Sequence, residues 1–296
     1  MRPVLSGMIL IMKDNEYCIE SKSENLIRGF HKLASRFSLT AVLLAIACMV
    51  QAQTSIDVYY IGNMGVHIKW EGGGCLIDGL HDYYGPNYQY PDSGLISSML
   101  NRVIPFDETD LLVITHVHHD HFDSDMSARF LENRTRGRLL APAQVLDTLA
   151  RHVDSYADIQ SQCRSMDAGP YHTEKVNIEF TPVRHTFQQR HYWVENYLVE
   201  LKIADRTIVH LGDAEASKEA FAGVKSIESV DLLIIPFWFL LSEDARDLAV
   251  SYFNPKVILA THLSPLIDED TLASMKKLFP SLILGREPGH VTTIQN

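Results

Sequence analysis

The chain has 296 residues, of which 46% are hydrophobic and 21% charged, so it has enough apolar side chains for a sizeable core. This composition excludes a disordered chain, a collagen-like fibre and a polytopic membrane protein. With 26 Lys and Arg against 37 Asp and Glu, the formal net charge is −11. An acidic surface repels phosphate, which disfavours a nucleic-acid substrate. Four cysteines are too few for a disulfide scaffold, and none of them forms a Cys-x-x-Cys metal motif.

An apolar segment at residues 39–50 is the prominent feature of the N-terminal part. Its 12 residues are fewer than the roughly 20 that a membrane-spanning helix needs. Basic residues precede it and small residues follow it, an order typical of a secretory signal peptide. We therefore predict a signal peptide over residues 1–52, cleavage after Ala52, and a periplasmic or secreted protein without a transmembrane segment. A lipid anchor at Cys48 is less favoured, because the residues before it only loosely match a lipoprotein cleavage box.

The mature sequence over residues 53–296 is predicted to form a single domain, because no Pro-, Gly- or Ser-rich linker and no charge block divides it. It contains Cys75 and Cys163. These two could pair in an oxidising compartment. Cys75 lies in a strand-like segment, however, and is better interpreted as a small buried hydrophobic residue.

In chain order, the first predicted elements are strands at residues 56–61, 66–70 and 74–78, separated by Gly and Asn. A tyrosine-rich loop at residues 79–91 follows, and residues 110–115 are predicted to form a buried strand. The remaining predicted elements are the helices 124–132, 143–152, 242–253 and 269–278 and the strands 176–183, 197–203, 207–211, 231–235 and 256–260. A strand-rich first half followed by alternating strands and helices predicts a layered α/β fold.

A cluster of histidines follows the predicted strand at residues 110–115. His116, His118, Asp120 and His121 form a His-x-His-x-Asp-His motif. Imidazole is the commonest protein ligand for transition metals, and Asp adds an anionic oxygen. A loop that leaves a strand can turn successive side chains toward one point, so His116 and His118 could face one metal ion while Asp120 and His121 face another. A solvated polar loop is the weaker alternative, because polar groups placed after a buried strand need partners.

Three further candidate ligands each follow an apolar strand: His185, Asp213 and His262. Each of them alone would be an ordinary loop residue. Together, and in this order, they favour a site for two metal ions, because two ions need more ligands than the motif supplies.

These residues, together with Tyr60–Asn63 and Leu76–Asp78, resemble the metallo-β-lactamase-fold hydrolase superfamily over essentially the whole mature chain. The resemblance implies an α/β fold, a four-layer αββα sandwich with the metal ions at one edge. It also implies two divalent cations, for which zinc is favoured and Mn²⁺ or Fe²⁺ are alternatives. By the same resemblance, the first ion takes His116, His118 and His185, the second takes Asp120, His121 and His262, and Asp213 bridges them.

Asp213 and His118 narrow the resemblance within the superfamily. True β-lactamases usually carry Cys or a non-ligand at the position of Asp213, whereas an Asp bridge resembles glyoxalase II, tRNase Z, lactonases and phosphodiesterases. Flavo-diiron oxidoreductases carry Glu where this chain has His118. The nearest resemblance is to the lactonase-like group that includes L-ascorbate-6-phosphate lactonase and N-acylphosphatidylethanolamine phospholipase D. The aromatic segment Pro236–Leu241 departs from the small turn of that group, which favours an apolar or lipid-like molecule over a sugar phosphate. Packing of these rings in the core or at an oligomer interface is the alternative.

The predicted function is that of a metal-dependent hydrolase acting on an ester, lactone or phosphodiester of a small or lipid-like molecule. Two cations would lower the pKa of a bridging water, and the resulting hydroxide would attack the carbonyl or phosphoryl centre. Asp120 is the predicted catalytic residue, which orients the hydroxide and passes its proton to the leaving group. The alternatives are β-lactam hydrolysis, a single-iron dioxygenase with the same ligands, and a metal-binding scaffold without activity.

Neighbouring polar residues are predicted to have supporting roles. His119 is expected at the surface or beside the ligands, and not as a ligand itself. Asp78 is expected to accept hydrogen bonds that steady the loop of His116. His210 and His290 are expected to form structural hydrogen bonds.

Overall fold

The computed structural model describes residues 55–294. The predicted signal peptide, its cleavage site and Cys48 lie outside these residues. Among the helices of residues 55–294, none combines the length and the hydropathy that a membrane span requires.

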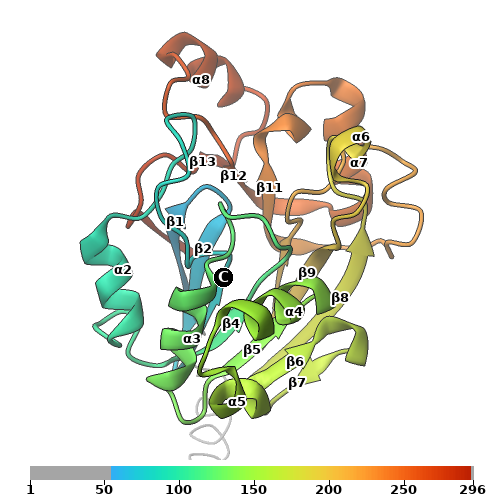
Figure 1. The fold of residues 1–296 in the computed structure, drawn as a ribbon. Coiled ribbons are helices and arrows are strands. Elements are labelled where there is room, and N and C mark those ends of the chain that lie inside the picture. The colour runs from blue at the N-terminus through green and yellow to red at the C-terminus, as the bar shows by residue number, and fades with distance from the viewer. Residues whose placement is uncertain (1–54, 295–296) are drawn as a thin grey trace, which may run out of the picture. The chain divides into compact units, whose positions relative to one another are not determined.

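Two mixed β-sheets face each other in residues 55–294 (Figure 1). Strands β14, β1, β2 and β3 of the first sheet are antiparallel, and β3 to β6 are parallel. The first sheet has the order β14-β1-β2-β3-β4-β5-β6, with β1 Ile56–Gly62, β2 Gly65–Trp70, β3 Gly73–Ile77, β4 Thr109–Val113, β5 Arg138–Ala141, β6 Cys163–Ser165 and β14 Val291–Ile294.

The second sheet repeats this division. Strands β7 to β10 are antiparallel, and β10 to β13 are parallel. Its order is β13-β12-β11-β10-β9-β8-β7, with β7 Tyr171–His172, β8 Val176–Val183, β9 Asn196–Ile203, β10 Arg206–His210, β11 Val230–Pro236, β12 Pro255–Thr261 and β13 Leu282–Leu284.

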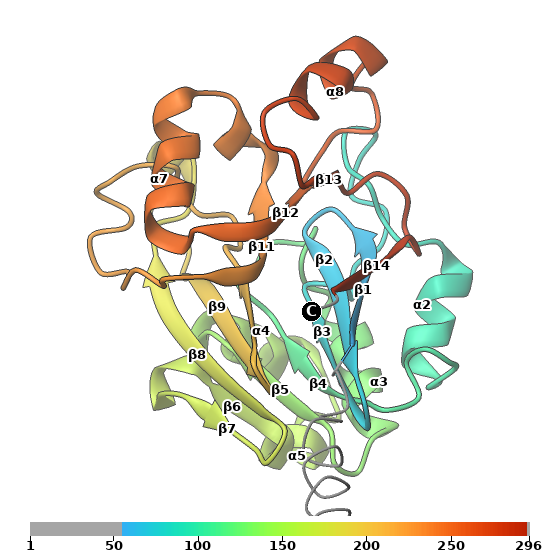
Figure 2. The ribbon, with the colours of Figure 1, turned by 180° about the vertical axis from the view of Figure 1, so that it is seen from behind.

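Helices cover the outer face of each sheet, as the two opposite views show (Figures 1 and 2). The first sheet carries α2 Ser93–Leu100, α3 Ser124–Glu132, α4 Ala143–His152 and α5 Tyr156–Ile159, followed by the short turns η1 Gln160–Gln162 and η2 Met166–Ala168. The second sheet carries η3 Phe237–Leu240, α7 Glu243–Phe253 and α8 Glu269–Met275, and α6 Gln188–His191 lies in the β8–β9 connection. The predicted four-layer αββα sandwich is therefore confirmed.

Alternation of side chains along the strands produces the layers. On β3, Cys75 and Ile77 belong to the apolar core between the sheets, whereas Leu76 belongs to the core under α2 to α5. On β11, Leu232 and Leu233 divide in the same way between the central core and the core under α7. Successive residues thus fill different layers, which is why the central strands are apolar on both faces.

Cys75 is fully buried and Cys163 is partly buried, and both are free thiols. The interpretation of Cys75 as a buried hydrophobic residue is confirmed, and the alternative of a disulfide between the two is wrong. Burial raises the pKa of the Cys75 thiol, so this residue is an inert part of the core.

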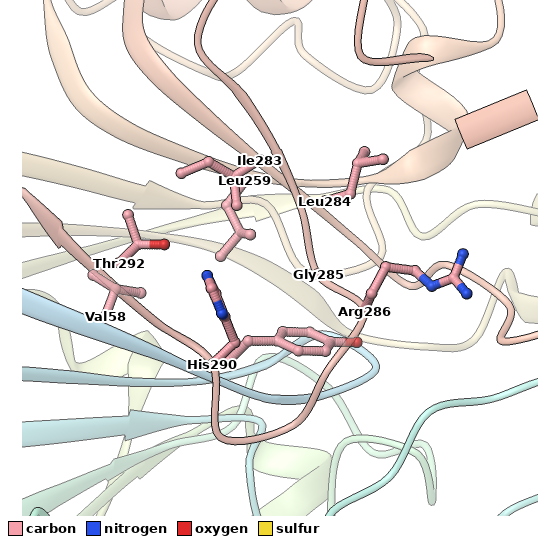
Figure 3. A pocket seen from close by; sticks show the side chains of 9 residues that line it. Val58, Leu259, Ile283, Leu284, Gly285, Arg286, His290 and Thr292 are labelled. Carbon is pink, nitrogen blue, oxygen red and sulfur yellow. The ribbon is translucent and has the colours of Figure 1, made fainter. Parts of the chain in front are cut away.

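A small cavity lies where β1 and β14 of the first sheet approach β12 and β13 of the second (Figure 3). Its volume is about 10 Å³, which is room for at most one water molecule. Val58, Leu259 and Ile283 contribute apolar side chains to its wall. It is a packing defect at the seam of the sandwich, and the site of chemistry lies elsewhere.

Candidate metal centre

The predicted ligands all lie just beyond the carboxyl ends of strands. The His116–His121 motif follows β4, His185 follows β8, Asp213 follows β10 and His262 follows β12. An isolated antiparallel bridge between His185 and Ala214 sets the loops after β8 and β10 side by side. In α/β folds the carboxyl ends of the strands are the usual place for a site, and here they bring residues from 116 to 262 together.

Asp78 holds the motif loop in place. Its Oδ1 accepts a hydrogen bond from the Thr115 backbone N–H (2.8 Å), and its Oδ2 accepts one from the Thr115 hydroxyl (2.6 Å). The same Oδ2 lies 2.9 Å from His121 Nδ1. Asp78 is fully buried, and this contact directs His121 Nε2 toward the centre of the site. The prediction that Asp78 steadies the loop is confirmed.

The predicted ligands form two groups in the structure. Their potential ligand atoms lie within 4.8 Å of one another in each group. The first group contains His116, His118, His185 and Asp213, and the second contains Asp120, His121 and His262. Asp78, His116 and His121 also satisfy this distance, but both oxygens of Asp78 already accept hydrogen bonds from Thr115.

Asp213 lies between the two groups. Its Oδ2 is 3.5 Å from His185 Nε2 and 3.5 Å from His262 Nε2. Its Oδ1 is 3.4 Å from His121 Nε2. The carboxylate therefore faces histidines of both groups, and His262 Nε2 is also 3.5 Å from Asp120 Oδ2.

Unsatisfied buried atoms show that this arrangement fits metal ions. His121 Nε2, His185 Nε2 and Asp213 Oδ1 are buried and have no hydrogen-bond partner among the described residues. Buried polar atoms are normally paired, so three unpaired atoms that converge on one site favour a bound ligand there. Imidazole nitrogens together with carboxylate oxygens suit Zn²⁺, Mn²⁺ and Fe²⁺.

The protonation of the two groups differs. Burial lowers the pKa of His118 to about 4 and holds the pKa of His116 well below its usual range, so both imidazoles are neutral. Burial alone would lower the pKa of His262 as well, but the carboxylates of Asp213 and Asp120 raise it to about 9. Burial alone would raise the pKa of Asp120, but His121 and His262 lower it to about 2. Binding of cations here must therefore release protons.

Asn63 is a site residue that the sequence analysis missed. It is 1% exposed, and its Nδ2 donates a hydrogen bond to Asp120 Oδ2 (2.8 Å). Its backbone oxygen accepts a hydrogen bond from the His262 N–H (3.0 Å). Asn63 thus holds two members of the second group. In the sequence it lies in a Gly-Asn turn between strands, and nothing local distinguishes it from an ordinary turn residue.

His191 was missed as well. Its ring centroid is 4.7 Å from that of His118 and 4.9 Å from that of His185. It belongs to α6, a single short helical turn that the sequence did not predict. With four residues and no apolar periodicity, this segment gave no signal that could have been found.

Both aromatic loops noted in the sequence reach the site. The ring centroid of Tyr88 is 5.6 Å from that of His262, and the centroid of Trp238 is 5.1 Å from it. Trp238 Nε1 donates a hydrogen bond to the Ala214 carbonyl (2.9 Å). Tyr88 and Trp238 line a cavity of about 120 Å³ over the ligand groups. Phe237 and Trp238 both pack against the core under α7, as the alternative for these rings predicted.

The remaining histidines behave as expected where the structure tests them. His119 is exposed and belongs to neither ligand group. His210 is fully buried, contacts the Met64 carbonyl through Nε2 (3.0 Å) and accepts a hydrogen bond from the Gly212 N–H (3.1 Å), which confirms a structural role.

Comparison with known proteins identifies the family. Residues 90–283, more than half of the chain, match the beta-lactamase superfamily domain. The chain belongs to the metallo-β-lactamase superfamily. Two UPF0173 metal-dependent hydrolases are similar in sequence to this chain. The protein from Pyrococcus horikoshii is 28% identical over 163 residues, covering 53% of this chain and 68% of its own length. The protein from Ignicoccus hospitalis is 23% identical over 212 residues, covering 71% and 83%.

Solved structures of the metallo-β-lactamase superfamily share the fold. The metallo hydrolase Igni18 from Ignicoccus hospitalis has a TM-score of 0.54 at 18% identity and covers 82% of this chain and 100% of its own. The metallo-β-lactamase fold protein YhfI from Bacillus subtilis has a TM-score of 0.56 at 15% identity, with 81% and 100% covered. The family and the His/Asp groups together make this chain a metal-dependent hydrolase of the metallo-β-lactamase superfamily.

Proposed function

We propose that this enzyme hydrolyses an ester, lactone or phosphodiester bond in a small or lipid-like molecule, using two divalent cations that are preferably zinc. The observation that carries the proposal is the position of Asp213, whose two oxygens face histidines of both ligand groups. A shared carboxylate is the arrangement expected of a two-metal hydrolytic site. The resemblance to the lactonase and N-acylphosphatidylethanolamine phospholipase D group supports the same choice of bonds.

In this proposal one ion is held by His116, His118 and His185, and the other by Asp120, His121 and His262, with Asp213 shared. When bound, the two cations supply Lewis acidity and make water a stronger nucleophile near neutral pH. Zinc is favoured because imidazole predominates among the ligands, and Mn²⁺ or Fe²⁺ are alternatives.

Asp120 is the proposed catalytic residue. Its Oδ2 accepts a hydrogen bond from Asn63 (2.8 Å) and lies close to His121 and His262 (3.7 and 3.5 Å). Its Oδ1 makes no hydrogen bond within residues 55–294, so it can accept a proton from water and return it to the leaving group. Asn63 fixes the orientation of the carboxylate while this happens.

Aromatic side chains define what reaches the centre. Tyr88 and Trp238 line the small cavity together with Phe187. Their rings favour an apolar group beside the scissile bond and limit the access of bulk water. This supports a lipid-like or otherwise apolar substrate over a sugar phosphate.

The proposal is tested first by metal content, measured by inductively coupled plasma mass spectrometry on protein purified without added metal. About two equivalents of zinc or manganese support it, whereas a single iron would contradict it and point to dioxygenase chemistry. A panel of esters, lactones and phosphodiesters then identifies the bond. Turnover must be lost in His118→Ala, and metal content must be kept in His119→Ala, which changes an exposed histidine of the same motif.

Export is a separate part of the proposal, supported by the apolar segment at residues 39–50 with its basic and small flanks. Cell fractionation with N-terminal sequencing tests it. We expect the protein outside the cytoplasm with a first residue near Gln53. A full-length cytoplasmic protein would remove the signal peptide from the proposal.

A further inference from the structure

A groove of about 660 Å³ adjoins the candidate metal centre. The groove and the small cavity over the ligands share two lining residues, His118 and Tyr84. The cavity itself holds only about 120 Å³, less than the roughly 300 to 1,000 Å³ of typical ligand pockets. A substrate larger than a few atoms therefore extends beyond the cavity, and the groove is an adjoining space that can receive the rest of it.

Two aromatic side chains from distant segments line this groove. Tyr84, from the loop after β3, is 48% exposed, and Trp193, from the β8–β9 connection, is 51% exposed. The Trp193 centroid is 6.2 Å from that of His118, and the Tyr84 centroid is 4.9 Å from that of Tyr88. Aromatic rings thus continue from the groove to the ligands.

The backbone at Trp193 is held in position, although the Trp193 ring is exposed. The Gln144 side chain donates a hydrogen bond to the Trp193 carbonyl (2.5 Å) and accepts one from the Glu195 N–H (2.9 Å). Glu195 in turn accepts a hydrogen bond from the Gln144 N–H (3.2 Å). These hydrogen bonds fix the backbone that carries Trp193, so its large aromatic ring is presented to solvent from a defined position.

The groove is lined by charges of both signs. Arg151 is its arginine, and Asp123 and Asp125 are its acidic residues, at the N-cap and in the first turn of α3. The Asp123 carboxylate is already used, because it accepts a hydrogen bond from the Met126 N–H (2.8 Å) at the start of α3. This lining gives no strong preference for an ionic group and leaves the aromatic walls to select the ligand.

We infer that this groove binds a flat, uncharged aryl portion of the substrate, which stacks against Trp193 and Tyr84 while the scissile bond lies at the metal centre. Only the position of the scissile bond at the metal centre rests on the proposed hydrolytic function. A groove that binds an aryl group would make the enzyme selective for aryl-bearing esters, lactones or phosphodiesters over aliphatic ones of the same size.

Binding of 2-naphthol to the protein as purified tests the groove without any turnover. The matched probe is decahydro-2-naphthol, which has the same carbon skeleton without a flat ring. Isothermal titration should show tighter binding of 2-naphthol. Removing a stacked ring costs about 1 kcal/mol beyond its buried area, so Trp193→Ala and Tyr84→Ala should each weaken binding at least about 5-fold. Tyr192→Ala is the control, because Tyr192 is 78% exposed beside Trp193 and does not line the groove.

Circular dichroism and metal content establish that each variant is folded and loaded. Equal binding of both probes, no binding of 2-naphthol at millimolar concentration, or unchanged binding in both variants overturns the groove assignment. If 2-naphthol binds as expected and none of the esters, lactones and phosphodiesters is hydrolysed, the groove assignment is supported and the proposed function fails. If 2-naphthyl acetate is hydrolysed with the same KM by wild type and both variants, the function is supported and the groove assignment fails.

Discussion

Strands β10 and β11 are parallel neighbours, and each end of this pair has one buried carboxylate. Asp231 lies at the start of β11, and Asp213 lies just beyond the end of β10. The two residues are almost equally buried, at 5% and 4% exposure. Both oxygens of Asp231 are bonded within the chain, by the Arg206 side chain (3.0 Å), the Thr207 N–H (2.9 Å) and the Lys256 side chain (2.8 Å). Asp213 keeps an oxygen without any hydrogen-bond partner.

This difference separates two uses of a buried charge. Around Asp231 the protein supplies partners for both carboxylate oxygens, so this carboxylate is satisfied when the chain has folded. Around Asp213 the partners are histidines with orphaned nitrogens of their own, so the network is complete only with a bound ligand. The end that contains Asp231 should therefore govern stability, and the end that contains Asp213 should govern metal binding and turnover.

The largest expected effect is that of Asp213→Asn. The change preserves shape and removes the charge that both ligand groups face, so we expect loss of bound metal and a fall in kcat/KM of at least about 10³-fold, because several kcal/mol of charge stabilisation are lost. Metal analysis and turnover of the best substrate measure this. Two retained metal equivalents with wild-type turnover would remove Asp213 from the centre.

At the opposite end, Asp231→Asn should lower the free energy of unfolding by about 3 kcal/mol, because Arg206 remains buried without its partner. Metal content should stay at the wild-type value. Chemical denaturation measures the first quantity. Asp205→Asn is the matched control, since Asp205 is an exposed carboxylate 3.8 Å from the same arginine and should cost less than about 0.5 kcal/mol. Loss of metal in Asp231→Asn would contradict the separation of the two ends.

Asn63→Gly tests how the metal end is supported. Asn63 has a φ of +46°, which glycine adopts without strain, and the backbone contacts with His262 and Tyr60 persist. Only the amide that holds Asp120 is lost. Loss of such a supporting hydrogen bond typically costs 10- to 100-fold in metal affinity or activity, so we expect roughly that effect.

Competition with a chelator measures the affinity of each ion in Asn63→Gly. The dissociation constant of the ion held by Asp120 should rise, and the dissociation constant of the ion held by His116 and His118 should stay the same. Asn254→Gly is the control, because Asn254 also has a positive φ (+37°) and lies at the end of α7. Two unchanged constants would leave Asn63 as a turn residue only.

The sequence predicted the regular parts of this molecule well. Helices α3 and α4 and strand β8 have the predicted bounds, because each has a clear apolar period and α3 begins at its own capping residue, Asp123. The predicted ligands come together for a similar reason. Each follows an apolar strand, β4 in the first sheet and β8, β10 or β12 in the second, and the carboxyl ends of these strands meet at one edge of the sandwich.

Other elements were not predicted because distant residues determine them. Strand β14 has four residues and pairs with β1 at the other end of the described chain. Strand β5 is equally short, and it is completed by its neighbours β4 and β6. Asn63 and Trp193 are site or groove residues only through contacts with Asp120 and Gln144. No local pattern in the sequence carries such information.

A last expected effect, negligible at neutral pH, concerns acid and the end of the sandwich that contains Asp231. His67, on β2, is fully buried, and its Nε2 lies 2.7 Å from the hydroxyl of Thr109, the first residue of β4. Burial lowers the pKa of His67 to about 3, whereas an unfolded histidine has a pKa of about 6.5. Between these values the unfolded state binds a proton that the folded state does not. Stability should therefore fall as pH falls from about 6.5 to 3, by up to about 1.4 kcal/mol per pH unit for one proton.

His67→Gln removes this proton but can keep a hydrogen bond to Thr109. The decisive quantity is the slope of the unfolding free energy against pH, which a constant loss of stability leaves unchanged. The slope should be shallower in His67→Gln than in wild type, and His172→Gln, at an exposed position of β7, controls for the loss of one histidine. Equal slopes for wild type and His67→Gln would mean that His67 is protonated in the folded state. His67 would then contribute nothing to the pH dependence of stability, and burial at the Asp231 end would not keep a histidine neutral.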